Sequence, residues 1–204
     1  VIDVLGTEKP DKLALLYVSN EGEEKRFTFG DMKRLSDRAA NYFVSEGVKK
    51  GDPVLLILKR SYLFWIITLA LNKIGAIMVP ASNMLKGKDY VYRCNKAKIK
   101  YAVITGDDNC TEYFDDRKDE YETIEKKFVT KHKPVEGWID FEDGFEKASE
   151  NWSRPTGDAA TTVDDTMIIN FSSGTTGYPK IIAHDFKYPL GHIMTGVFWH
   201  RVVD

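Results

Sequence analysis

Cysteine is scarce in this sequence, with two residues in 204, and neither sign of charge prevails. Cys94 and Cys110 are too few for a disulfide framework and lack the spacing of metal ligands, so we expect two buried, inactive thiols in a reducing compartment. The 29 basic and 31 acidic residues leave a net charge of -2, which gives no broad attraction to nucleic acid or to an anionic membrane. Any anion that binds must therefore be held locally.

A long apolar run is also missing. The most apolar stretch, residues 62–71, stops at Asn72 and Lys73, whereas a membrane span takes about 20 such residues. We therefore expect a buried helix there and no integral membrane segment. No secretory signal opens the chain, so the cytoplasm is the expected compartment, with the mitochondrial matrix as the alternative if a presequence has been removed. The sequence begins at Val1 rather than at a methionine, and its last residues complete no helix or strand. We therefore expect the chain to be a piece of a longer reading frame.

Apolar runs alternate with helical patterns between residues 28 and 105. Thr28 and Asp31 have the spacing of a capping box, at the start of a helix that ends near Gly47. The run at residues 53–58 is apolar throughout, as in a parallel strand covered on both faces. Further strands are expected at residues 76–80 and 101–105, and helices at 62–74 and 89–98. This order predicts an α/β fold, a parallel sheet flanked by helices.

The second half of the chain has a weaker pattern. Residues 107–133 are highly charged, and residues 115–122 among them indicate a solvated helical face. A short helix at 141–149, a loop at 151–165 and a strand at 166–171 should follow. We expect a first α/β subdomain in residues 1–150 and the beginning of a second one in residues 151–204.

The expected strand at 166–171 runs into a segment dense in hydroxyl groups, glycine and lysine, Ser172-Ser-Gly-Thr-Thr-Gly-Tyr-Pro-Lys180. Glycines let backbone N–H groups turn toward a phosphate, hydroxyls donate to its oxygens, and a lysine adds a compact positive charge. The segment is not a Walker A loop, because Tyr-Pro separates Gly177 from Lys180 and an isoleucine follows. A flexible surface turn is the alternative interpretation. The predicted phosphate-binding residues are Ser172, Ser173, Gly174, Thr175, Thr176, Gly177 and Lys180.

This segment closely resembles the phosphate loop of the adenylate-forming (AMP-binding) superfamily, Ser/Thr-Ser/Thr-Gly-Thr-Thr/Ser-Gly-x-Pro-Lys. That superfamily comprises acyl-CoA synthetases, aryl-CoA ligases, luciferases and the adenylation domains of peptide synthetases. Upstream, residues 27–31, 47–54 and 73–80 look like its N-terminal landmarks. The segments that are similar to medium-chain acyl-CoA synthetases in particular are residues 89–93, 137–141 and 182–184. The resemblance implies the N-terminal fragment of the acyl-CoA synthetase-like large domain, without the C-terminal lid.

By this resemblance, the intact enzyme joins a carboxylic acid, expected to be a medium-chain fatty acid, to ATP. It releases pyrophosphate and passes the acyl group from AMP to coenzyme A. The segment 172–180 would hold the β- and γ-phosphates together with Mg²⁺. The metal-binding glutamate, the ribose-binding aspartate and the lid lysine would lie beyond Asp204. The resemblance therefore implies that the chain alone is inactive, with no catalytic residue and no metal ligand of its own, and it does not indicate an oligomeric state.

Two other functions remain open. The chain could belong to an aryl-CoA ligase or an adenylation domain that uses a different acid or acceptor, because the acid-lining residues are not in this sequence. It could also be a non-catalytic module that binds a nucleotide or polyphosphate, with no ligase activity.

Several other side chains are expected to have structural roles only. His184 should pack or hydrogen-bond on the strand that leaves the loop rather than act as a base. We expect Phe64 and Trp65 to lie in the core, and Arg93 and Lys96 to be surface charges of a helix. Asp164 and Asp165 should cap the loop. The remaining histidines should have no metal partner, with the last two on one helix: His132, His192 and His200.

Overall fold

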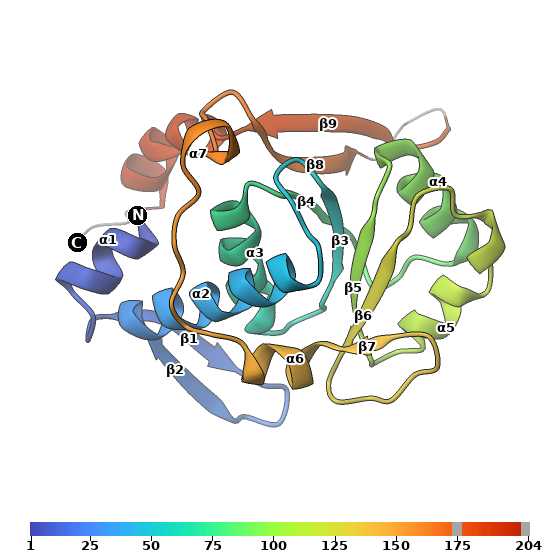
Figure 1. The fold of residues 1–204 in the computed structure, drawn as a ribbon, viewed down its shortest axis with the longest axis horizontal. Helices are drawn as coiled ribbons and strands as arrows, with labels where there is room; N and C mark the ends of the chain where they lie inside the picture. The colour runs from blue at the N-terminus through green and yellow to red at the C-terminus, as the bar shows by residue number, and fades with distance from the viewer. Residues whose placement is uncertain (173–176, 201–204) are drawn as a thin grey trace.

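The apolar runs of the sequence form strands of one seven-stranded sheet, which lies between two layers of helices (Figure 1). This computed structural model describes residues 1–172 and 177–200. The strand order is β7-β6-β5-β3-β4-β8-β9, and each neighbouring pair is parallel except β8 with β9. The predicted α/β fold with a sheet flanked by helices is confirmed. The strands are β3 (Pro53–Ile57), β4 (Ile77–Pro80), β5 (Tyr101–Thr105), β6 (Lys126–Thr130), β7 (Ile139–Asp140), β8 (Thr166–Ser172) and β9 (Lys180–Asp185).

Strand β3 is apolar along its whole length because both of its faces are covered. Val54 and Leu56 belong to the core on one face, whereas Leu55 and Ile57 belong to the core on the other. Neighbouring strands pair with it in parallel register, with Val54 opposite Met78 of β4 and Tyr101 of β5. The centre of the sheet is thus a continuous apolar layer, as a parallel sheet requires.

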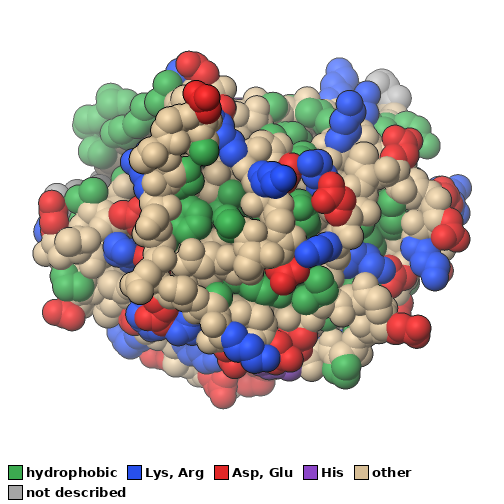
Figure 2. Space-filling view, viewed as in Figure 1, with side chains coloured by type: hydrophobic (Ala, Val, Ile, Leu, Met, Phe, Trp, Pro, Cys, Tyr) green, Lys and Arg blue, Asp and Glu red, His purple; other side chains and the backbone are tan. Residues whose placement is uncertain are grey.

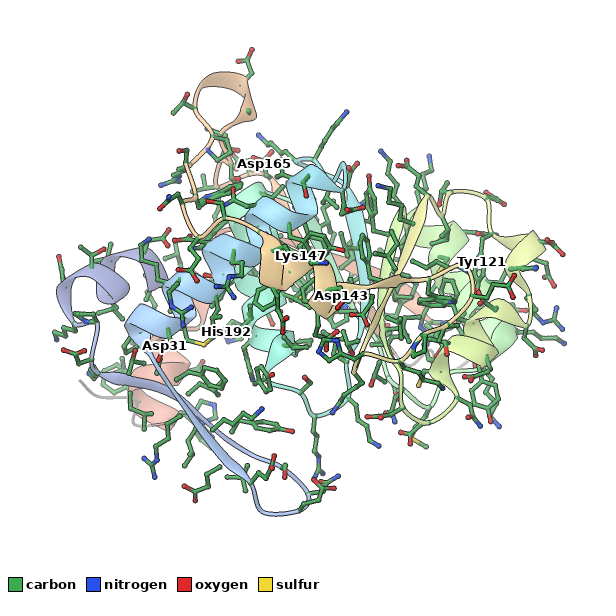
Figure 3. All side chains as sticks on the ribbon, turned by 60° about the horizontal axis from the view of Figure 1, so that its bottom comes forward. Asp31, Tyr121, Asp143, Lys147, Asp165 and His192 are labelled. Carbon is green, nitrogen blue, oxygen red and sulfur yellow. The ribbon has the colours of Figure 1, made fainter. Side chains whose placement is uncertain are left out.

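Helices α2 (Phe29–Ser45), α3 (Leu63–Ile74) and α6 (Phe141–Lys147) pack on the first face. The predicted capping box begins α2: the Thr28 hydroxyl accepts the N–H of Asp31 at 3.1 Å, and the Asp31 carboxylate accepts the N–H of Thr28 at 3.1 Å. Figure 3 shows Asp31 at this end of the helix. Helix α3 ends at Gly75, whose φ of 80° is the left-handed conformation that glycine adopts without strain.

Helices α4 (Gly87–Ala97) and α5 (Cys110–Asp115) pack on the second face. Tyr90, Cys94 and Phe114 are completely buried between them and the sheet. Both cysteines are unpaired and buried, as expected, and burial raises the pKa of the Cys94 thiol to about 12. A thiol in this environment stays protonated and unreactive.

The first 28 residues form a helix and a hairpin that the sequence analysis did not predict. Helix α1 (Ile2–Glu8) lies against α2, and strands β1 (Leu13–Val18) and β2 (Glu24–Thr28) pair antiparallel in a separate two-stranded sheet. Phe27 and Tyr62 pack with their ring centroids 5.1 Å apart, which attaches the hairpin to the segment before α3.

The solvated helical face expected over residues 115–122 is only partly present: most of these residues are exposed, but they form no regular helix. Helix α5 is short, a single 3-10 turn covers Lys118–Glu120, and residues 126–130 form β6 inside the sheet. Phe128 and Val129 are buried there, and the lysines before them are paired. Lys126 reaches Glu46 at 2.9 Å and Lys127 reaches Asp115 at 2.6 Å, so the charges that precede the buried residues of this strand are neutralised.

Trp65 is a second correction, because 53% of its surface is exposed on α3. Phe64 is half-buried and packs against the core, as expected. The two residues are neighbours on a helix, and therefore they face different directions, about 100° apart around its axis.

A 3-10 turn at Gly157–Ala159 lies within the loop before β8, and two short helical segments follow the last strand, α7 (Tyr188–Gly191) and a π-helix at Thr195–Trp199. The expected single helix that carries His192 and His200 is thus interrupted. Figure 2 shows hydrophobic side chains gathered at the upper left, where these last segments lie in Figure 1. The exposed members are Tyr188, Leu190, Ile193, Met194, Val197, Phe198 and Trp199.

Within residues 1–172 and 177–200, no helix combines the length and the apolar composition that crossing a bilayer takes. Strand β8 pairs with β4, so the segment after residue 165 extends the sheet of the preceding residues. The division into subdomains at residue 150 stays a prediction.

Candidate functional site

The predicted phosphate-binding segment is the connection between β8 and β9 at one edge of the sheet. Ser172 and Lys180 are opposite each other in the antiparallel ladder and close the base of this turn. The hydroxyl of Ser172 lies 3.5 Å from the carbonyl oxygen of Lys180, to which it donates. The structure therefore brings together the first and last residues of the predicted site. Ser173, Gly174, Thr175 and Thr176 lie outside the described residues.

The C-terminal limb of the turn has features that suit an anion. Gly177 has a φ of 147°, in the region that glycine adopts and other residues rarely do. Among the residues that the structure describes, none has an atom within 4 Å of the position that a Cβ would take there, which leaves room for an approaching group on that side. Lys180 is exposed, and among the described residues no carboxylate lies within ion-pair distance of its ammonium group. These features fit a phosphate, and their binding role stays a prediction.

Residues of α4 contact this limb of the turn. Tyr178 stacks on Tyr92, with ring centroids 4.6 Å apart and 20° between the planes. The hydroxyl of Tyr92 donates to the carbonyl oxygen of Pro179 at 2.8 Å. Sequence reasoning missed this contact, because residues 89–93 appeared only as a landmark of the resemblance.

Arg93 is a correction to the sequence analysis, which expected a surface charge. Its side chain is only 14% exposed, and its guanidinium carbon lies 5.3 Å from the centroid of the Phe171 ring. Its carboxylate neighbour Asp89 is 3.7 Å away on the same helix. Arg93 therefore packs α4 against the strand that leads into the turn, through a cation–π contact.

The other polar residues near the hairpin have the structural roles expected of them. His184 packs against Tyr188, with ring centroids 4.1 Å apart. Asp164 pairs with Lys187, and Asp165 pairs with Lys50 at 2.8 Å while it accepts the N–H of Thr162. The hydrogen bond from Lys50 holds the pKa of the Asp165 carboxyl below its usual value. These contacts fasten the loop that precedes β8 to the rest of the fold.

The deciding comparison is with protein families. A model described as AMP-binding enzyme matches residues 4–201. This chain belongs to that family. The human mitochondrial acyl-coenzyme A synthetase ACSM3 is 31% identical over 195 residues, which cover 94% of this chain and 32% of the relative. The rat mitochondrial acyl-coenzyme A synthetase ACSM4 is 29% identical over 194 residues, again 94% of this chain and 32% of the relative.

Solved structures support the fold of this AMP-binding chain. An anthranilate CoA ligase, AuaEII, in complex with anthranoyl-AMP superposes with a TM-score of 0.81 at 24% identity, over 97% of this chain and 37% of that one. An acyl-CoA synthetase from Brucella canis gives a TM-score of 0.79 at 21% identity, over 92% and 33%. The resemblance to acyl-CoA synthetases is confirmed, and the chain spans about a third of the length of the curated relatives it matches.

A possible cation site lies far from the turn in sequence, where His132 Nδ1 is 3.5 Å from Asp140 and 3.9 Å from Asp143. Among the residues that the structure describes, these three alone form a group with metal-ligand geometry. Figure 3 shows Asp143 on α6, and the Asp140 carboxylate accepts the N–H of Asp143 as the N-cap of that helix. The cluster is largely exposed and already has this capping role. The sequence analysis assigned no metal ligand, and that prediction is unchanged.

The carboxyl ends of β3 and β4 border a hollow of about 440 Å³, lined by residues 58–60 and 81–83 among others. Ligands of open α/β sheets often bind at such strand ends. Lys59 lies in its wall and pairs with Asp108 at 2.7 Å, so its charge is already neutralised. The sequence analysis missed this hollow, because it depends on how loops from three strands meet.

Proposed function

We propose that this chain is the N-terminal part of an AMP-forming acyl-CoA synthetase and that the β8–β9 turn binds the triphosphate of ATP. The observation that carries the proposal is the position of residues 172–180. A hydroxyl- and glycine-rich segment ending in lysine connects two strands at an open edge of the sheet, in a chain of the AMP-binding enzyme family. An ordinary surface turn also uses glycine, serine and proline, so what favours phosphate binding here is the lysine after the hydroxyl groups together with the family match.

In the proposed reaction, a carboxylate oxygen of the acid attacks the α-phosphorus of ATP and pyrophosphate leaves, which gives an acyl-adenylate. The thiol of coenzyme A then attacks the acyl carbonyl, and AMP leaves with the electrons of the bond that breaks. The turn contributes by position and charge: the hydroxyls of Ser172, Ser173, Thr175 and Thr176 donate to the β- and γ-phosphates, and Lys180 balances their charge. Backbone N–H groups at Gly174 and Gly177 add further donors.

The donor set of residues 172–180 fits phosphate oxygens rather than a bare metal ion, since it contains no carboxylate. Mg²⁺ would therefore enter with the nucleotide, held mainly by phosphate oxygens and hydroxyls of the turn, as is usual for this ion. It would neutralise phosphate charge. No carboxylate ligand comes from the turn, which is consistent with a glutamate ligand supplied from elsewhere in an intact enzyme.

The acid substrate that we propose is a medium-chain fatty acid, on the similarity of residues 89–93, 137–141 and 182–184 to medium-chain synthetases. An aryl-CoA ligase or an adenylation domain is the second candidate, because a solved neighbour is an anthranilate CoA ligase. We further propose that the 204 residues alone are inactive. For the compartment, the sequence predicts the cytoplasm, and the names of the relatives favour the alternative of the mitochondrial matrix.

Acid-dependent exchange of pyrophosphate into ATP tests this proposal. The protein expressed from its full reading frame should catalyse exchange with Mg²⁺ and should prefer acids of medium chain length, whereas the 204-residue chain should not. Full-frame Lys180→Ala, and Thr175→Val with Thr176→Val, should reduce exchange about 100-fold or more, as expected when charge stabilisation is lost. Lys187→Ala is the matched control, since Lys187 is an exposed lysine paired with Asp164. Exchange at the wild-type rate in the Lys180 variant would remove the phosphate-binding role.

If the full-frame protein is folded and shows no exchange with any acid, the ligase proposal fails. Binding of ATP without exchange would then favour the module that binds a nucleotide and has no ligase activity.

A further inference from the structure

Helix α4 contacts both sides of the turn that we propose as the phosphate site, and one residue makes most of these contacts. Tyr92 stacks on Tyr178 and donates its hydroxyl to Pro179 on the C-terminal limb. On the other limb its ring meets the ring of Phe171, the residue before Ser172, with centroids 6.3 Å apart and planes at 66°. A residue of helix α4 thus joins the two limbs of the hairpin.

The helix that carries Tyr92 is firmly held. Tyr90 and Cys94, two positions before and after Tyr92, are completely buried in the core on the second face of the sheet. Residues two apart on a helix point in different directions, so Tyr92 faces the hairpin while these neighbours face the core. The adjacent Arg93 adds its contact with Phe171. The hydroxyl of Tyr92 therefore has a fixed position relative to the sheet.

The carbonyl of Pro179 belongs to the peptide group that continues into Lys180. A peptide group is planar, so a hydrogen bond to this carbonyl also fixes the orientation of the Lys180 N–H. Proline restricts its own φ, which removes a further degree of freedom at this point. Tyr178 is 73% exposed, and within the described part of the chain its ring stacks on Tyr92. The limb therefore depends on Tyr92 for its order.

We propose that Tyr92 is a positioning residue for ATP: it holds the C-terminal limb of the turn so that Lys180 and the N–H groups of the limb face the phosphates before ATP binds. This inference rests on the proposed function. If the limb is already ordered in the free protein, the binding free energy of ATP does not have to offset the conformational entropy that is lost when the limb becomes ordered. Loss of Tyr92 should then weaken ATP binding and adenylate formation and leave the acid largely unaffected.

The test is pyrophosphate exchange by the full-frame protein, with KM for ATP and KM for the acid measured separately. Tyr92→Ala should raise KM for ATP and lower kcat/KM for ATP roughly 10- to 100-fold, as for a misplaced binding group, with KM for the acid unchanged. Tyr92→Phe keeps the ring stack and loses only the hydrogen bond, so its loss should be about 2- to 10-fold. Tyr113→Ala on α5 is the matched control. Tyr113 is also a half-buried helical tyrosine, and its ring contacts Lys86 rather than the turn.

Circular dichroism and thermal unfolding establish that each variant is folded, and Tyr92→Phe serves as the test if Tyr92→Ala does not fold. Tyr178→Ala combined with Tyr92→Ala should cost little more than Tyr92→Ala alone, because the two rings act through one contact. If the wild type is active and folded Tyr92→Ala has the same KM for ATP, the role of Tyr92 is overturned and the ligase proposal stays intact. If Tyr92→Ala does not fold, an unchanged KM for ATP in Tyr92→Phe has the same meaning. Equal rises in both KM values would also overturn it. A wild type without exchange would overturn both proposals.

Discussion

The centre of the sheet and the β8–β9 hairpin are both rich in apolar strand residues, and they differ in how completely they are covered. Every residue of β5 is buried, whereas every residue of β9 is exposed or half-buried. Helices pack on both faces of the centre, whereas at the edge Tyr92 and Arg93 of α4 contact the end of the hairpin next to the turn. Stability should therefore reside in the centre, and the residues with binding chemistry lie at the less covered edge, where a ligand can reach them.

An isoleucine in each region tests this difference most strongly. Ile57 in β3 is completely buried, whereas Ile182 in β9 is 43% exposed. Ile57→Ala should lower the free energy of unfolding by about 4 kcal/mol, because it removes buried methyl groups and leaves a cavity. Ile182→Ala should lower it by less than about 1 kcal/mol, as expected for a partly exposed site. Urea unfolding followed by tryptophan fluorescence measures both changes.

Ile57→Val is the graded control and should cost about 1 kcal/mol, since only one methylene is lost. Equal losses for the two alanine variants would mean that the hairpin is as much a part of the cooperative core as β3, and the comparison would be wrong.

Two lysine–aspartate pairs give the next test. Lys73 is only 6% exposed and pairs with Asp37, itself buried, whereas Lys187 is half exposed and pairs with Asp164 beside the hairpin. Lys73→Met should lower the free energy of unfolding by about 3 kcal/mol, because Asp37 stays buried with a lost partner. The loss should fall at the low end of the range for buried pairs, since Lys33 still lies 2.7 Å from Asp37. Lys187→Met should have no measurable effect, as is usual for exposed pairs.

The double variant Lys73→Met with Asp37→Leu is the control for this pair. It removes the stranded charge and should recover part of the stability that Lys73→Met loses. A Lys73→Met protein as stable as the wild type in thermal unfolding would show that Asp37 is not dependent on this partner.

The sequence predicted the centre better than the edge, for a physical reason. Residues 53–58 are apolar on both faces, and Thr28 with Asp31 makes a cap from local contacts alone, so local pattern was sufficient. Strand β6 was missed because Lys126 and Lys127 look like surface charges until distant residues pair with them. The hairpin β1–β2 was missed because its burial does not alternate cleanly. Such assignments depend on tertiary contacts that a local window does not contain.

The candidate site shows the same limit. Residue types and spacing were sufficient to locate residues 172–180 and to predict a strand on either side. They gave no indication that β9 returns antiparallel to β8, or that Tyr92 and Arg93, about 80 residues earlier in the sequence, contact the hairpin. Those relations arise from the order of strands in the sheet, in which β8 lies next to β4 and close to the helix that follows it.

The smallest expected effect concerns two Thr-x-x-Asp segments in which the aspartate carboxylate accepts the N–H and the hydroxyl of the threonine. Asp31 accepts the N–H of Thr28 at 3.1 Å at the start of α2, and Asp165 accepts the N–H of Thr162 at 2.6 Å before β8. The pKa of each carboxyl is lowered, at Asp31 mainly by the backbone hydrogen bond from Thr28 and at Asp165 mainly by Lys50. The two segments should therefore respond differently to pH and to salt.

Asp31→Asn should lower the free energy of unfolding at pH 7 by about 0.5–1 kcal/mol, a modest loss because the side chain is partly exposed and screened. The folded pKa lies below the unfolded value of about 3.9, so this stabilisation is present above pH 4 and is lost as the pH falls through the folded value. The wild type and Asp31→Asn should thus converge in urea unfolding as the pH falls from about 4 through the folded pKa, and their difference at pH 7 should change little with salt. The difference for Asp165→Asn should shrink as NaCl is raised to about 1 M, because it depends on an exposed ion pair. A salt-sensitive loss in Asp31→Asn would contradict this expectation. It would mean that the ion pair of Asp31 with Arg34 contributes more to stability than the capping box, so that both segments depend on exposed ion pairs.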